Sequence, residues 1–169
     1  MDQRRIALLA LAIGLVGVMV MPGSVQAQPA PAALAAGNGW VVAPTPHRFA
    51  DLVRRLEAAV TANKMVIVNA ASASDGAKAQ GITIGGNRVV GVYRNDFARR
   101  MLAASIPAGI EAPIRFYLTE NAEGAATLSY RSPSSVFGPY FDKAGPALKS
   151  LAEELDSIFA AIAAEAIKP

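Results

Sequence analysis

The sequence predicts an α+β fold: a two-layer sandwich in which a mostly antiparallel sheet carries two to three helices on one face. Short glycine-containing turns join neighbouring strand-like segments, as in β-hairpins. Stretches with helical spacing of apolar residues separate these hairpins, and a long amphipathic helix ends the chain. A doubly wound parallel sheet would need a helix after nearly every strand, and the pattern lacks these helices.

The first 27 residues have the pattern of a secretory signal peptide. Arg4 and Arg5 precede an apolar run of 16 residues, 6–21, and the small residues of Ser24-Val25-Gln26-Ala27 follow. The alternative is an uncleaved membrane anchor, but a spanning helix needs about 20 apolar residues. We therefore expect cleavage after Ala27 and a periplasmic or secreted protein, with no membrane contact after cleavage.

Composition predicts one folded domain and excludes several kinds of chemistry. Residues 28–38 are rich in Pro, Ala and Gly and predict a flexible linker, which leaves 39–169 as a single α+β domain. The net charge of +3 falls to +2 without the leader, and no basic run suggests a nucleic-acid partner. The chain has no cysteine, which excludes disulfides, a thiolate nucleophile and thiolate metal ligands.

The first half of the domain predicts a strand, a helix, a second strand and a hairpin. Residues 40–42 are strand-like, and Thr45-Pro46 predicts an N-cap and first helical residue before an apolar stripe over 49–60. Residues 65–68 predict a buried strand, and 70–79 predict either a short helix or a loop. Residues 81–84 and 88–93, around Gly85-Gly86, predict a hairpin.

The second half predicts a helix, another hairpin and the terminal helix. Asp96 is the expected N-cap of a helix over 97–105, which Pro107 helps to stop. Residues 114–120 and 127–130 predict a hairpin in which Arg115, Tyr117 and Thr119 share one face. Residues 132–139 predict a loop, and apolar residues between 148 and 162 predict a long helix packed on the sheet.

Polar residues near the strand ends form the candidate ligand site. Backbone N–H groups at a helix N-terminus can receive an anion, and a sheet face without a helix over it would form a small-molecule cleft. The candidate ligand-binding residues are Tyr93, Asn95, Asp96, Arg115, Tyr117, Glu120, Tyr130 and Ser132. The alternative is a solvated sheet face in which Asp96 is only an N-cap.

Other kinds of site have little support. His47 is the single histidine and no nucleophile-elbow sequence is present, so no catalytic residue is assigned. A zinc or copper site needs several His or Cys ligands, so we expect no metal and no cofactor. The glycines at 81, 85, 86 and 91 lack the Lys-Ser/Thr of a phosphate-binding loop and do not begin a helix.

Several segments together resemble one protein family. They are Phe-Ala-Asp-Leu-Val-Arg-Arg-Leu at 49–56, the junction at 93–96, Pro-Ile-Arg-Phe-Tyr-Leu-Thr-Glu at 113–120 and Ser-Tyr-Arg-Ser-Pro at 129–133. Over about residues 49–162 the chain resembles the domain of unknown function 302 (DUF302) family. The resemblance implies a compact α+β domain of small exported bacterial proteins and no established activity. Family members often carry Gly-Asn-Pro where this chain has Arg94-Asn95-Asp96.

We therefore expect a non-enzymatic binding or interaction module of the cell envelope, whose partner is a small molecule or an envelope protein. Two alternatives stay open. One is a small acid–base enzyme that uses Glu120 or Asp96 with a tyrosine, Tyr93 or Tyr130, because a carboxyl group in an apolar cleft can have a raised pKa. The other is a structural homodimer that associates through a sheet edge or the final helix.

Overall fold

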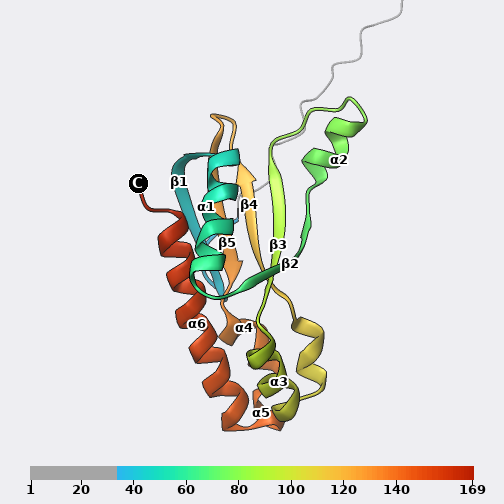
Figure 1. Ribbon diagram of the computed structural model, residues 1–169, viewed down its shortest axis with the longest axis vertical. Helices are drawn as coiled ribbons and strands as arrows, with labels where there is room; N and C mark the ends of the chain where they lie inside the picture. The colour runs from blue at the N-terminus through green and yellow to red at the C-terminus, as the bar shows by residue number, and fades with distance from the viewer. Residues whose placement is uncertain (1–33) are drawn as a thin grey trace, which may run out of the picture. The chain divides into compact units, whose positions relative to one another are not determined.

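The computed structural model describes residues 34–169, which build a five-stranded sheet in the order β1-β5-β4-β3-β2 (Figure 1). Every neighbouring pair of strands is antiparallel. The strands are β1 (Trp40–Arg48), β2 (Val66–Ala71), β3 (Asn87–Tyr93), β4 (Ile114–Glu120) and β5 (Ala125–Arg131). The predicted signal peptide and residues 28–33 of the predicted linker lie outside the described residues.

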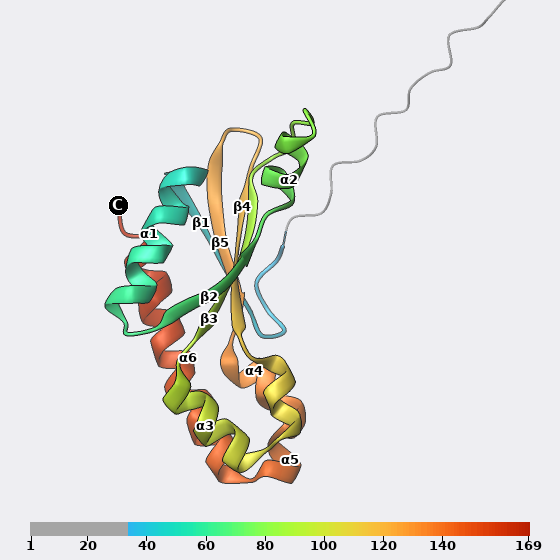
Figure 2. The same ribbon diagram turned by 45° about the vertical axis from the view of Figure 1, so that its right-hand side comes forward.

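Two helices cover one face of this sheet. Figure 2 shows α1 and α6 side by side along that face, and the two helices pack against each other. The helices are α1 (Phe49–Ala62), α2 (Ala73–Ala79), α3 (Asn95–Ala104), α4 (Pro133–Phe137), α5 (Phe141–Ala144) and α6 (Pro146–Ala166), with 3₁₀ turns η1 (Pro107–Glu111) and η2 (Gly138–Tyr140). The predicted α+β sandwich with a long C-terminal helix is confirmed.

The core lies between the sheet and these two helices. On β4 the side chains of Ile114, Phe116 and Leu118 are buried, and the alternating residues face the other way. Phe116 stacks on Phe159 of α6 with ring centroids 4.8 Å apart, and Tyr130 of β5 lies 5.0 Å from Phe116 and 5.8 Å from Phe159. This aromatic cluster joins the two central strands to the longest helix.

Beyond one end of the sheet, α3 and α4 pack against α6. Arg100 of α3 binds Glu154 of α6 through two hydrogen bonds of 2.8 and 2.6 Å. The guanidinium lowers the pKa of the Glu154 carboxyl group through this pairing. Asp156 of α6 accepts hydrogen bonds from the backbone N–H and the hydroxyl group of Ser134, so it holds the first turn of α4.

The predicted start of the first helix is wrong. Strand β1 continues to Arg48, and Thr45 lies inside it with its hydroxyl group donating to the carbonyl of Ala126 at 2.7 Å. Two prolines, Pro44 and Pro46, are tolerated here because β1 is an edge strand with an irregular register after Pro44. Helix α1 then begins at Phe49 without a side-chain cap.

The predicted hairpin over 81–93 is also wrong. Residues 73–79 form α2, and Gly81, with φ of +76°, ends it: the N–H of Gly81 donates to Lys78 and that of Ile82 to Ala77. These two bonds define a Schellman motif, in which glycine takes the left-handed conformation after the last helical turn. Residues 82–86 are irregular, and β3 pairs with β2 and β4 instead.

Residues 132–139, predicted as a loop, contain α4 and part of η2. The hydroxyl group of Ser132 accepts a hydrogen bond from the N–H of Ser135, and Pro133 occupies the first turn. Serine at the N-cap followed by proline is a helix-start signal, so the sequence did carry this information. Among the helices of residues 34–169, none is both long and apolar enough to cross a membrane.

We expect Phe159→Ala to destabilise the fold strongly, because it opens a cavity under Phe116 in the centre of the core. The free energy of unfolding should fall by about 3–5 kcal/mol in urea denaturation. Ile110→Ala is the control, since Ile110 is 80% exposed and its loss should change stability by less than about 0.5 kcal/mol. Similar losses for both variants would contradict the assignment of Phe159 to the core.

The two glycines near α2 should respond in opposite directions to alanine. Gly81→Ala forces a side chain into the left-handed region, which costs about 1–2 kcal/mol, and should speed hydrogen exchange at the Ile82 amide. Gly76 lies within the helix, with open space where a Cβ would be. Gly76→Ala should therefore raise the free energy of unfolding by about 0.5–1 kcal/mol and slow that exchange. Equal effects would be inconsistent with the Schellman motif.

Candidate functional site

A cleft of about 590 Å³ lies on the sheet face opposite α1 and α6, because its residues Arg115 and Tyr117 alternate with the core residues of β4. This volume is within the usual range for small-molecule sites. The cleft is lined by Trp40, Ala71, Ala73, Asn87, Val89, Glu111, Ile114, Arg115, Tyr117, Arg131 and Val136. Residues from all five strands or their flanking turns therefore contribute to one concave surface.

The floor of the cleft follows from the alternation of the central strands. Because Phe116 and Leu118 point into the core, Arg115 and Tyr117 point to the opposite face. Tyr117 lies opposite Val89 of β3 in the ladder, and Arg115 lies opposite Gly91, which has no side chain. The floor therefore combines one guanidinium group with an aromatic ring and small apolar neighbours.

One wall of the cleft is built by Trp40 and Arg131, which lie opposite each other on β1 and β5. Gly39, with φ of +82°, lies so close to Ser135 that a Cβ there would be 1.9 Å from the Ser135 hydroxyl oxygen. The carbonyl of Gly39 accepts from the N–H of Ser132 at 2.8 Å. These contacts attach the start of β1 to α4 and place Trp40 beside the cleft.

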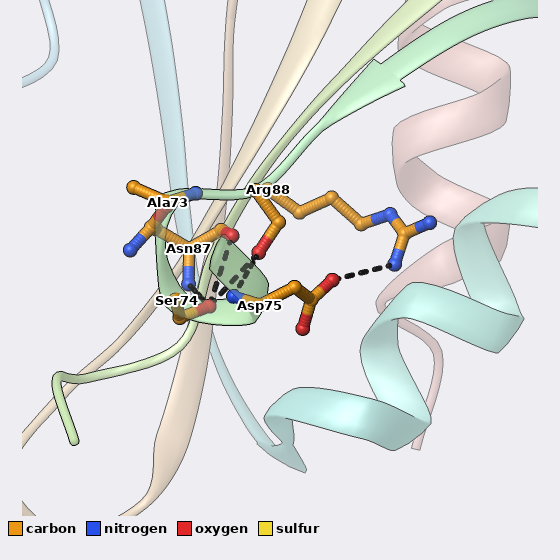
Figure 3. A network of polar contacts seen from close by, with 6 residues as sticks. Ala73, Ser74, Asp75, Asn87 and Arg88 are labelled. Carbon is orange, nitrogen blue, oxygen red and sulfur yellow. Dashed lines mark hydrogen bonds and ion pairs between the residues drawn. The ribbon is translucent and has the colours of Figure 1, made fainter. Parts of the chain in front are cut away.

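The opposite rim is held by hydrogen bonds between α2 and β3, which Figure 3 shows. The side-chain oxygen of Asn87 accepts from the N–H of Ala73 at 2.9 Å, and the Asn87 N–H donates to the hydroxyl group of Ser74 at 3.2 Å. A guanidinium nitrogen of Arg88 lies 3.7 Å from a carboxylate oxygen of Asp75. Asn87 and Ala73, which both line the cleft, are therefore fixed relative to each other.

The cleft contains two cationic side chains and one carboxyl group. Arg131 donates to the hydroxyl oxygen and the carbonyl of Ser135, at 2.7 and 3.3 Å. Glu111 accepts a hydrogen bond of 2.8 Å from the hydroxyl group of Tyr140, and this bond raises the pKa of the tyrosine. Arg115 is exposed and makes no ion pair with any residue of the described part.

Of the predicted site residues, the structure brings Arg115 and Tyr117 into this cleft. Tyr130 is on the other face, because it lies opposite Phe116 in the ladder. Burial raises the pKa of the Tyr130 hydroxyl group, and the negative charge of Asp156 raises it further. Glu120 is also separate, with its carboxylate accepting from the N–H of Gly86 at 2.8 Å. Ser132 caps α4 and does not line the cleft.

The remaining predicted site residues lie at the start of α3. Arg94 is the N-cap residue, so the prediction of Asp96 as N-cap is wrong, and Asp96 lies in the first turn. Asp96 binds Arg94 with contacts of 2.7 and 3.1 Å, and this hydrogen bonding lowers the pKa of its carboxyl group. Asn95 is exposed, and Tyr93 lines a separate, mostly apolar cavity of about 30 Å³.

The sequence prediction missed Trp40, Arg131 and Glu111. Arg131 follows from strand alternation once the pairing of β5 with β4 places Tyr130 opposite Phe116 in the core, because Arg131 must then face the cleft. The position of Trp40 also needs the pairing of β1 with β5, which joins segments far apart in the sequence. Glu111 lies in a 3₁₀ turn that the sequence pattern did not indicate.

Other chemical groups do not extend this site. His47 lies in β1, and its ring forms a 2.7 Å hydrogen bond with the carbonyl of Lys168 near the C-terminus. Within residues 34–169, no group of three or more His, Cys, Asp or Glu side chains is placed to hold a metal ion. The arrangement in the cleft can therefore bind and orient a molecule through guanidinium, amide and aromatic groups.

Comparison with known proteins shows the family. The sequence model described as Domain of unknown function DUF302 matches residues 41–165. A crystal structure of an uncharacterized conserved DUF302 protein from Bacillus stearothermophilus is similar, with a TM-score of 0.64 and 17% identity. That match covers 73% of this chain and 94% of the other chain, and it shows a shared fold. None of the curated proteins compared with the chain matches it. This chain therefore belongs to the DUF302 family.

Proposed function

We propose that this protein is a non-enzymatic binding module of the bacterial cell envelope, and that its ligand is a small molecule bound on the open face of the sheet. The observation that carries the proposal is the cleft of about 590 Å³, which lies over the strands on the face that α1 and α6 leave free. Its lining combines aromatic and aliphatic side chains with a few polar groups, as in small-molecule sites generally.

The charges in the chain favour binding over acid–base catalysis. An acid–base role for Asp96 would need a carboxyl group whose pKa is raised toward neutrality. Its pairing with Arg94 lowers that pKa instead. Glu120 is engaged with the backbone of Gly86, and Tyr130 is buried in the aromatic core. None of these three residues lines the cleft.

The sheet edge at β2 favours a homodimer as a second candidate. Strand β2 is an edge strand without charged residues, and its Val66 and Val68 are 57% and 50% exposed. Proteins usually protect such edges with charges or proline. The other edge, β1, has both Pro44 and Pro46, so only the β2 edge offers an unprotected backbone to a second copy.

Export is tested by native mass spectrometry of the protein purified from its own host. The leader pattern predicts a mature chain that begins at Gln28. A chain of full length in the envelope would contradict cleavage and support the anchor. The same spectrum distinguishes a dimer from a monomer, and it detects a bound small molecule as added mass.

The cleft is tested with Trp40, because this side chain lines the cleft and is the single tryptophan of the chain. We expect benzamide, a neutral aromatic probe, to change Trp40 fluorescence in a saturable way. Ala71→Phe should weaken this binding by placing a ring inside the cleft. Ala70→Phe is the control, since Ala70 is also exposed but faces the opposite side of β2. Equal binding by both variants would rule out this cleft.

A further inference from the structure

The positive charges of the cleft are grouped on two neighbouring strands. The β4–β5 ladder pairs Phe116 with Tyr130, and Arg115 and Arg131 are the next residues along the two strands. Both arginines line the cleft, on the face opposite this aromatic pair. Like charges at facing positions of neighbouring strands destabilise a sheet unless an opposite charge compensates for them.

Compensation within the described residues is incomplete. The ion pairs of residues 34–169 involve Arg54, Arg88, Arg94 and Arg100, and neither cleft arginine takes part in one. Glu111 is the one carboxyl group among the residues that line the cleft, and it already accepts the hydrogen bond from Tyr140. The lining therefore has an excess of one positive charge.

The two arginines differ in how firmly they are held. Arg131 is oriented by two hydrogen bonds to Ser135, which leaves further N–H donors of its guanidinium group for a ligand. Among residues 34–169 Arg115 has no anionic partner, and it stands opposite Gly91, whose open side is occupied by the side chains of Asn69 and Pro113. A guanidinium group presents paired donors that match the two oxygens of a carboxylate.

The rest of the lining is mainly apolar and partly aromatic. Trp40 lies beside Arg131, Tyr117 follows Arg115 by two residues on the same strand face, and Val89 and Val136 complete this surface. The volume is far larger than an inorganic ion requires. The lining therefore suits a ligand that carries one anionic group on a flat apolar body.

We propose that the ligand is a small organic anion, with a carboxylate held by Arg115 and Arg131 and an aromatic or similarly flat body against Trp40 and Tyr117. This assignment rests on the proposed function, because it specifies the ligand of the same cleft. Binding of such an anion compensates for the excess positive charge of the lining. Exposure of both arginines also means that added salt should weaken the interaction.

The test compares benzoate with benzamide, which has the same ring and a neutral amide, on the whole protein by Trp40 fluorescence and calorimetry. We expect benzoate to bind roughly tenfold more tightly than benzamide. Arg115→Gln should reduce this difference by weakening benzoate binding more than benzamide binding, because one of the two guanidinium groups that hold the carboxylate is lost. Arg99→Gln is the matched control, since it removes an exposed charge of α3 outside the cleft and should preserve the difference.

Each other outcome overturns a defined part of the inference. Equal affinities for benzoate and benzamide would reject the anion and retain a binding cleft. Inorganic phosphate that binds as tightly as benzoate would reject the role of the apolar body. No binding of any of the three probes, with Trp40 unaffected, would overturn both the anion and the proposed use of the cleft.

Discussion

The structure depends on the aromatic contact between Phe116, Tyr130 and Phe159. These side chains join β4, β5 and α6, and they fix which face of the central strands is buried. Strand side chains alternate, so the burial of Phe116 determines that Arg115 and Tyr117 face away from the helices. A shift of register by one residue would place a guanidinium group in the core, which gives this register a large energetic advantage.

The same constraint explains how a small domain can keep one sheet face open. Helices α1 and α6 pack on one face and bury long rows of apolar side chains there, so the core does not need the other face. The short elements α2, α4 and η1 lie around the open face and contribute residues to the rim of the cleft. Hydrogen bonds of Asn87 and Ser135 hold this rim through the backbone and through short polar side chains.

Periodicity in the sequence was sufficient for the long elements. The spacing of apolar residues predicted α1 and α6, and the alternation in 114–120 predicted both faces of β4. Errors arose where a local signal had two structural uses. Thr45-Pro46 fits an N-cap, but in β1 the threonine hydroxyl group reaches Ala126, and glycine at 81 ends a helix instead of joining two strands. The first outcome depends on a contact with a strand far away in the sequence, whereas the second depends on which of two local uses the glycine takes.

The candidate site was predictable only where one strand determines it. Arg115 and Tyr117 follow from the pattern of β4 alone, whereas Trp40 and Arg131 need the pairing of β1 with β5 and of β5 with β4. The prediction included Glu120 and Ser132 because they are polar residues at strand ends. Their side chains instead accept hydrogen bonds from backbone N–H groups, and these bonds stabilise the fold. In the cleft, by contrast, Arg115 faces solvent without an anionic partner among residues 34–169, although a neutral residue there would lower the excess positive charge of the lining. A charge that stability does not favour is the kind of local inconsistency that functional sites retain.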